Sequence, residues 1–132
     1  MRQIADAVVI GGGVMGCSIQ YYLAKLGTTD SLLLEQDVLG SGSTGRSQTI
    51  CRTHYSNPIT TKLAWQSLRV FTNFAEIVGG DAGFVKTGYL VVVGLADQNG
   101  LKKNVSMQQE LGVSTVLVTA DDVKDFAPMI RV

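Results

Sequence analysis

Residues 4–35 contain the feature that most constrains how this 132-residue chain can fold. An apolar run at 8–10 leads into a glycine-rich turn at 11–16, and a second apolar run at 31–34 ends at Glu35. This order is typical of a strand, a helix and a second strand of a parallel sheet, followed by an acid. The expected elements are a strand at about 5–10, a helix at about 14–26 that ends at Gly27, and a strand at about 31–35.

Three glycines of this turn have a physical role in a site for a dinucleotide. Gly11 lets the chain turn sharply out of the first strand, and Gly13 removes the side chain that would keep a pyrophosphate from the backbone. Gly16 lets the helix pack close to the sheet. The helix then begins with Val14 and Met15, where unpaired N–H groups and the positive end of the helix dipole favour an anion. All five residues are predicted to bind the cofactor.

Glu35 lies 19 residues after Gly16, near the spacing of about 20 that is expected of a carboxylate that binds ribose hydroxyls. A negative charge there disfavours a 2′-phosphate, so NAD or FAD fits better than NADP. The competing interpretation is a glycine-rich turn of an unrelated α/β protein. The full order of strand, turn, helix, strand and acid favours dinucleotide binding.

Composition excludes several other classes of function. The chain is 45% hydrophobic and has 11 basic and 11 acidic residues, which gives no electrostatic preference for nucleic acid or an anionic membrane. No apolar run approaches the roughly 18 residues that span a bilayer. Cys17 and Cys51 form no CxxC pair, so we expect a reducing, cytoplasmic setting and no metal site.

The rest of the chain alternates between helical and strand patterns. A loop rich in glycine and hydroxyl groups is expected at 37–48, at the carboxyl edge of the sheet, where ligand contacts are common. The further expected elements are a helix at 58–78, two short strands within 83–93, a helix at 97–111, a strand at 113–118 and a helical turn at 120–126. Only one complete βαβ unit is visible, whereas a doubly wound sheet needs several, so we expect the chain to be an N-terminal fragment.

The sequence resembles the FAD-dependent amine oxidoreductases of the D-amino acid oxidase and sarcosine oxidase family, most strongly the beta subunits of heterotetrameric sarcosine oxidase. The resemblance is carried by residues 6–16, Glu35, the segment 42–47, Arg52, Tyr55 and 87–90, and it continues to Pro128. It implies an α/β fold, with the N-terminal part of a Rossmann-like FAD-binding domain at 1–80. The beginning of a mixed-sheet substrate domain is implied at 81–132.

The resemblance also implies roles for the loop and for Arg52. Four loop residues would pass beside the flavin and its pyrophosphate: Ser43, Thr44, Arg46 and Ser47. Arg52 would lie by the flavin face as a catalytic residue that holds a substrate carboxylate or stabilises reduced flavin, unless it is a structural arginine. His54, the single histidine, has no assignable carboxylate partner and is expected to be a polar loop residue. Tyr55 is a candidate for the pocket wall.

In the related enzymes an amine is oxidised to an imine, and an N-methyl amino acid such as sarcosine is the expected substrate. Some members attach flavin to a histidine near the position of Arg46, so FAD is expected to be non-covalent here. Other subunits are conceivable partners. Two alternatives stay open, an NAD-dependent dehydrogenase and a non-catalytic nucleotide-binding fragment or subunit. The fragment alone is expected to be inactive and to self-associate through exposed apolar faces.

Overall fold

The computed structural model describes residues 4–130, so the outer ends of the predicted domains 1–80 and 81–132 lie outside the described residues. The structure contains two compact units that divide between Ile50 and Cys51. We call them the first and the second unit and describe each by itself. No helix in the described part of the chain is both long and apolar enough to cross a membrane.

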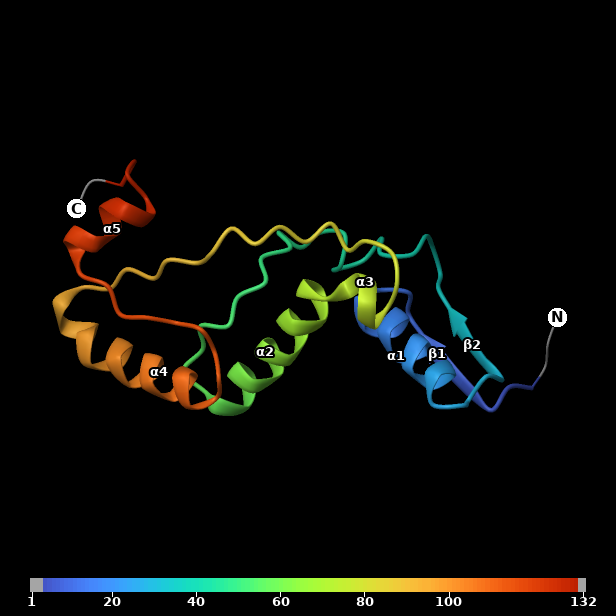
Figure 1. The fold of residues 1–132 in the computed structure, drawn as a ribbon. Helices are drawn as coiled ribbons and strands as arrows, with labels where there is room; N and C mark the ends of the chain where they lie inside the picture. Colours follow the sequence, from blue (N-terminus) through green and yellow to red (C-terminus); the bar gives the residue numbers. More distant parts are fainter. Residues whose placement is uncertain (1–3, 131–132) are drawn as a thin grey trace. The chain divides into compact units, whose positions relative to one another are not determined.

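The first unit is a single βαβ arrangement, shown in blue and cyan in Figure 1. Its elements are β1 (Ala7–Ile10), α1 (Val14–Lys25) and β2 (Ser31–Leu34). The strands are parallel, with Val8 opposite Leu32 and Ile10 opposite Leu34. The predicted strand, helix and strand are therefore confirmed, and with them the α/β class.

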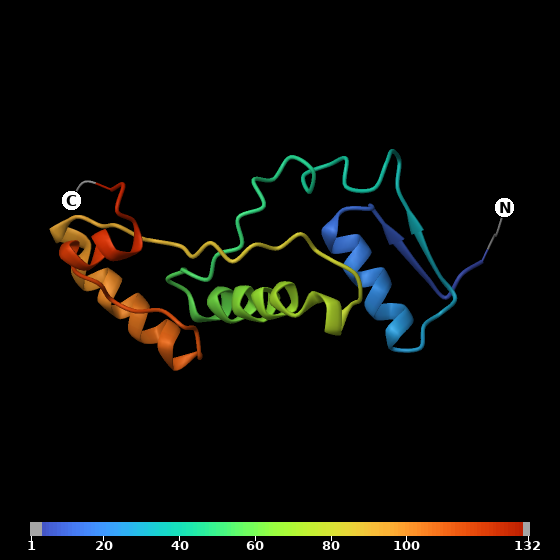
Figure 2. The ribbon, with the colours of Figure 1, turned by 45° about the horizontal axis from the view of Figure 1, so that its top comes forward.

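Helix α1 covers one face of the strand pair (Figure 2). The side chains of Val9 and Leu33 are half-buried, whereas the apolar side chains on either side of them in each strand are exposed. At its C-terminus the helix ends with Gly27 at φ +99°, and the N–H of Thr28 donates to the carbonyl of Leu23 at 2.9 Å. This positive φ confirms the left-handed glycine predicted at this end. Residues other than glycine rarely adopt such a backbone conformation.

The second unit is built from helices joined by extended chain. Its elements are α2 (Pro58–Thr72), α3 (Phe74–Ile77), a 3-10 turn η1 (Leu95–Asp97), α4 (Gln98–Glu110) and α5 (Ala120–Phe126). The most buried apolar side chains of the described residues are Val105, Val113 and Val123, at 5 to 6% exposure. The core of this unit therefore lies around α4 and α5.

The continuous helix predicted at 58–78 is wrong at one position. The chain leaves the helical conformation at Asn73, with φ −116° and ψ 34°, and α3 follows as a separate turn. The side-chain amide of Asn73 donates to the carbonyl of Arg69 at 2.8 Å, beside the backbone N–H of Asn73 at 3.1 Å. An amide that competes for a helical carbonyl is a known cause of helix ends.

The strands predicted within 83–93 and at 113–118 are also wrong. The only ladder between described residues joins β1 and β2, and both predicted segments run as extended chain outside any sheet (Figure 1). An alternating apolar pattern favours extended backbone, but a strand exists only where a neighbouring segment pairs with its N–H and carbonyl groups. The pattern indicated the conformation and could not supply the partner.

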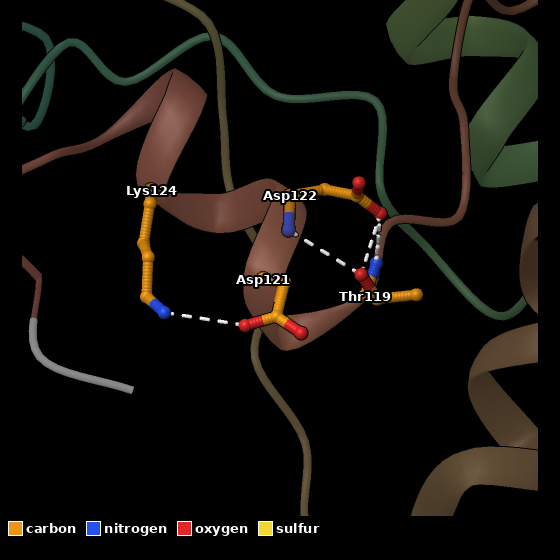
Figure 3. Close-up of polar contacts among 4 residues, drawn as sticks. All are labelled: Thr119, Asp121, Asp122 and Lys124. Carbon is orange, nitrogen blue, oxygen red and sulfur yellow. Dashed lines mark hydrogen bonds and ion pairs between the residues drawn. The ribbon is translucent and has the colours of Figure 1, made fainter.

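Helix α5 begins with a complete capping box (Figure 3). The backbone N–H of Asp122 donates to the hydroxyl oxygen of Thr119 at 3.3 Å, and Asp122 Oδ2 accepts from the Thr119 N–H at 2.7 Å. The Thr119 hydroxyl also donates to Asp122 Oδ2, which lowers the pKa of this carboxyl, and the backbone bond adds to the effect. The sequence thus specifies the start of the predicted helical turn at 120–126, which is confirmed.

Candidate functional site

The glycine turn joins the end of β1 to the start of α1. Gly11 has φ +101°, and its N–H donates to the carbonyl of Leu34 at 2.7 Å, which continues the pairing of the two strands. Gly13 is the N-cap of α1 and supplies no side-chain acceptor. The first N–H groups of the helix therefore need acceptors from outside the turn.

Gly16 permits the closest approach between α1 and this turn. A Cβ atom built at Gly16 would lie 1.8 Å from the carbonyl oxygen of Gly11 and 3.5 Å from Val9 Cγ1. A backbone oxygen cannot withdraw from a side chain as a flexible group could. Glycine is therefore required at this position for the helix to keep its place.

Glu35 is joined to the glycine turn by hydrogen bonds. Its Oε2 accepts from the N–H of Gly12 at 2.5 Å, and its Oε1 accepts from the N–H of Asp37 at 3.0 Å. These bonds, the one from Gly12 above all, lower the pKa of Glu35 below its ordinary value of 4.5. The carboxylate is therefore ionised at neutral pH and keeps lone pairs for further donors, as ribose hydroxyls would require.

Gly12 is a site residue that the sequence reasoning did not select. A Cβ at this position would lie 2.5 Å from Leu39 Cδ2 and 3.1 Å from both Cβ and Oε2 of Glu35. The available signal was the unbroken run of three glycines, since the usual fingerprint leaves its middle position unspecified. Gly12 thus makes room for the acid that it also binds.

The loop after β2 returns to the N-terminus of α1. Thr44 Oγ1 accepts from the N–H of Val14 at 2.9 Å and lies 3.0 Å from the position of a Cβ at Gly13. The N–H of Gly40 donates to the carbonyl of Gly12 at 2.9 Å. The structure therefore brings together the glycine turn, Glu35 and Thr44, three parts of the predicted site.

The other predicted loop residues are less engaged. Ser43, Arg46 and Ser47 are exposed, and Ser47 Oγ accepts from the N–H of Thr49 at 2.9 Å. Val14 and Met15 are 53% and 72% exposed, so the first turn of α1 presents its surface openly. Their contacts with a cofactor stay a prediction.

Arg52 belongs to the second unit and has two aromatic neighbours there. Its Nη1 donates to the hydroxyl of Tyr89 at 3.3 Å, and its guanidinium carbon lies 5.1 Å from the centre of the Tyr55 ring. The hydrogen bond to the Tyr89 hydroxyl above all, and then the neighbouring Tyr55, raise the pKa of Arg52 above its ordinary value. The group is a permanent cation oriented by two rings.

Three parts of the first unit suit a dinucleotide: the glycine turn with the start of α1, Glu35 and Thr44. Gly11 leaves open space where a Cβ would stand, α1 is 12 residues long, and its first turn contains no acidic side chain that would repel a phosphate. Glu35 supplies an ionised acceptor beside the turn. Thr44 adds a hydroxyl to the same helix end.

Comparisons with known proteins agree with this geometry. The sequence profile of the DAO family, described as FAD dependent oxidoreductase, matches residues 6–132. The 4-methylaminobutanoate oxidase (formaldehyde-forming) of Paenarthrobacter nicotinovorans is 36% identical over 125 residues, which are 92% of this chain and 15% of that protein. The mitochondrial pyruvate dehydrogenase phosphatase regulatory subunit of Mus musculus is 30% identical over 129 residues, 97% of this chain and 15% of that protein.

Two further proteins are similar along almost the whole chain. The sarcosine oxidase subunit beta of an Arthrobacter species is 30% identical over 129 residues, 96% of this chain and 32% of that subunit. The crystal structure of L-proline dehydrogenase from P. horikoshii superposes with a TM-score of 0.84 and 30% identity, over 97% of this chain and 34% of that one. The chain thus spans a small part of each relative, and it belongs to the DAO family of FAD-dependent oxidoreductases.

Proposed function

We propose that this chain forms the beginning of the cofactor site of an FAD-dependent amine or amino acid oxidoreductase, with an N-methyl amino acid such as sarcosine as substrate. The observation that carries the proposal is the Glu35 carboxylate bound to the Gly12 N–H within a chain that matches the family over residues 6–132. The names of the similar oxidases and dehydrogenase support the reaction class.

The residues of the first unit would hold FAD as follows. The N–H groups at the start of α1 would donate to the pyrophosphate, and Glu35 would accept from ribose hydroxyls. The Thr44 hydroxyl would contribute at the same helix end, with Ser43, Arg46 and Ser47 in the adjoining loop. The chemistry that FAD supplies when bound is removal of a hydride equivalent from the carbon beside an amine, which leaves an imine.

Arg52 would hold the carboxylate of the substrate. Its charge is permanent, and the Tyr55 ring and the Tyr89 hydroxyl limit the directions in which the guanidinium points. A planar guanidinium binds a carboxylate by two parallel hydrogen bonds. Fixing the carboxylate in this way would orient the neighbouring C–H bond for oxidation.

Titration of the 132-residue chain with FAD, followed by flavin fluorescence, tests the cofactor. We expect weak binding of FAD that NAD does not displace, because the family is FAD-dependent. Glu35→Gln should weaken it, and Glu110→Gln, a change at an exposed position, should not. Tighter binding of NAD than of FAD, or a form as long as the relatives that never binds flavin, would overturn the proposal.

A non-catalytic subunit is a second candidate, favoured by the similarity to a protein named as a regulatory subunit. The similarity to a sarcosine oxidase beta subunit likewise supports a setting with other subunits. Sarcosine added without oxygen to the flavin-loaded, extended protein distinguishes the two candidates. Loss of the oxidised flavin absorbance supports catalysis, whereas an unchanged spectrum supports the non-catalytic role.

The proposal also includes non-covalent attachment of FAD, the domain spans 1–80 and 81–132, and a cytoplasmic location. Arg46 stands near the position where some members of the family carry a histidine that is covalently bonded to the flavin. An arginine forms no such bond to flavin. Acid precipitation of the loaded protein should release all flavin into solution. Flavin that stays in the pellet would show a covalent link, and cell fractionation tests the location.

We also propose that the isolated chain self-associates. The face of the β1–β2 pair that bears Val8, Ile10, Leu32 and Leu34 is apolar and 37 to 85% exposed. Ile10→Thr should shift the chain toward monomer in size-exclusion chromatography, whereas Leu26→Thr, also at an exposed position, should not. A clean monomer with stoichiometric flavin would contradict this.

A further inference from the structure

Gln108 is a large polar side chain that is almost completely buried in the second unit. It lies on α4 on the same stripe as Leu101 and Val105, and it is 1% exposed. Its Nε2 atom lies 3.0 Å from His54 Nδ1 and 3.3 Å from the carbonyl oxygen of Tyr55. Burying an amide on an apolar stripe costs free energy unless the amide forms hydrogen bonds inside the protein.

The Tyr55 carbonyl is fully engaged at this point. It also accepts from the hydroxyl of Thr61, at 3.3 Å, and Thr61 has no exposed surface. A carbonyl oxygen has two lone pairs, and Gln108 and Thr61 together fill them. The backbone at Tyr55 is therefore anchored to α2 and α4 by buried side chains.

This arrangement determines where the protons lie. A backbone carbonyl only accepts hydrogen bonds, so the Gln108 atom facing Tyr55 must be the amide nitrogen and not its oxygen. That nitrogen has two hydrogens, one for the carbonyl and one for His54 Nδ1. Nδ1 is then the acceptor, and the single proton of a neutral imidazole is placed on Nε2.

We propose that Gln108 is a positioning residue that holds His54 as the Nε2–H tautomer and, through the Tyr55 carbonyl, sets the direction of Arg52. The ring of Tyr55 lies against the Arg52 guanidinium at 5.1 Å. Arg52 itself is exposed, so its orientation depends on the groups beside it. This inference rests on the proposed function only where it concerns substrate carboxylate binding by Arg52.

The tautomer is measured directly by nitrogen NMR of the 132-residue chain. His54 is the single histidine, so one imidazole gives the whole signal. We expect Nδ1 at the chemical shift of an unprotonated ring nitrogen and Nε2 at that of a protonated one. A protonated Nδ1 in the neutral ring, or equal populations of the two tautomers, would overturn the inference whatever Arg52 does.

Variants separate the role of the amide from that of its volume. Gln108→Glu keeps the shape but replaces the donor by an acceptor, so Nδ1 should become protonated. Gln108→Leu removes the donor, and the preference for one tautomer should be lost. Gln98→Leu, a change at an exposed position of the same helix, is the control and should leave the spectrum unchanged.

The consequence for Arg52 is tested in the extended, flavin-loaded enzyme. Gln108→Glu should raise the KM for sarcosine about tenfold, the factor that accompanies a weakened hydrogen bond to a charged group, and should lower kcat by a smaller factor. An amine that lacks a carboxylate should show no such rise. The expected tautomer together with an unchanged KM would disprove the link to Arg52, whereas absence of turnover in the unsubstituted enzyme would instead refute the proposed function.

Discussion

Thr44 and Val14, thirty residues apart in the sequence, are joined by a hydrogen bond of 2.9 Å from the Val14 N–H to the Thr44 hydroxyl oxygen. Because Gly13 has no side chain to cap α1, a residue from the loop after β2 performs the capping. The same hydroxyl would meet a phosphate at the helix end. Stability of the helix and geometry of the cofactor loop are therefore coupled through one oxygen atom.

Thr44→Val should destabilise the first unit, since valine has the shape of threonine but accepts no hydrogen bond. We expect a loss of about 1 kcal/mol in the free energy of unfolding, as for other helix caps. Hydrogen exchange of the Val14 amide should accelerate at the same time. Thr44→Ser keeps the hydroxyl and should retain most of the protection; equal exchange in the valine variant and the unsubstituted chain would contradict the coupling.

Gly16→Ala should be more damaging than Thr44→Val. Its new Cβ would overlap the Gly11 carbonyl oxygen, 1.8 Å away, and α1 would have to move from the turn. We expect about 3 kcal/mol of destabilisation, as for an overpacked core, measured as a lower urea midpoint. Gly42→Ala is the matched control, because a Cβ there meets nothing within 4 Å, and the idea fails if the two variants unfold at the same urea concentration.

The first unit was largely predictable from the sequence because its interactions are local or follow a strict spacing. Gly11, Gly16 and Glu35 each have one geometry that suits the turn, and the structure places them accordingly. The contact between Thr44 and Val14 was not predictable, although both residues were selected. A loop residue gives no periodic signal of the atom that it will meet.

The second unit shows where sequence patterns fail. The alternation within 83–93 indicated strands, but pairing depends on a partner that no local pattern contains. Gln108 gave a weak signal, a polar residue on the stripe of Leu101 and Val105, and its contacts with His54 depend on tertiary packing. The contact of Arg52 with a substrate also depends on groups that the local sequence pattern does not contain, so it stays a prediction.

Glu35 predicts a defined dependence of stability on pH. Its pKa in the folded chain lies below 4.5 because the Gly12 N–H, and then that of Asp37, donate to its ionised form. The stabilisation is therefore complete at pH values above 4.5 and is lost as the pH falls through the lower folded value. Glu35→Gln should unfold more easily than the unsubstituted chain at neutral pH, and the difference should shrink in acid.

Urea unfolding on both sides of pH 4.5 measures this difference. Glu110→Gln removes a charge at an exposed position of α4 and serves as the control for net charge. A gap between Glu35→Gln and the unsubstituted chain that stays constant from neutral to acidic pH would show that the Gly12 bond does not depend on ionisation.

The capping box of α5 gives a test within the second unit. Thr119→Ala removes the oxygen that accepts from the Asp122 N–H and the hydroxyl that lowers the pKa of the Asp122 carboxyl (Figure 3). We expect a loss of about 1 kcal/mol, seen as faster hydrogen exchange in 120–126, and an upward shift of the Asp122 pKa in a carbon NMR titration. Lys124→Ala should change both much less, because the ion pair of Lys124 with Asp121 joins side chains that are 60% and 93% exposed. If Lys124→Ala accelerates exchange as much as Thr119→Ala, the surface ion pair and not the capping box fixes the start of the helix.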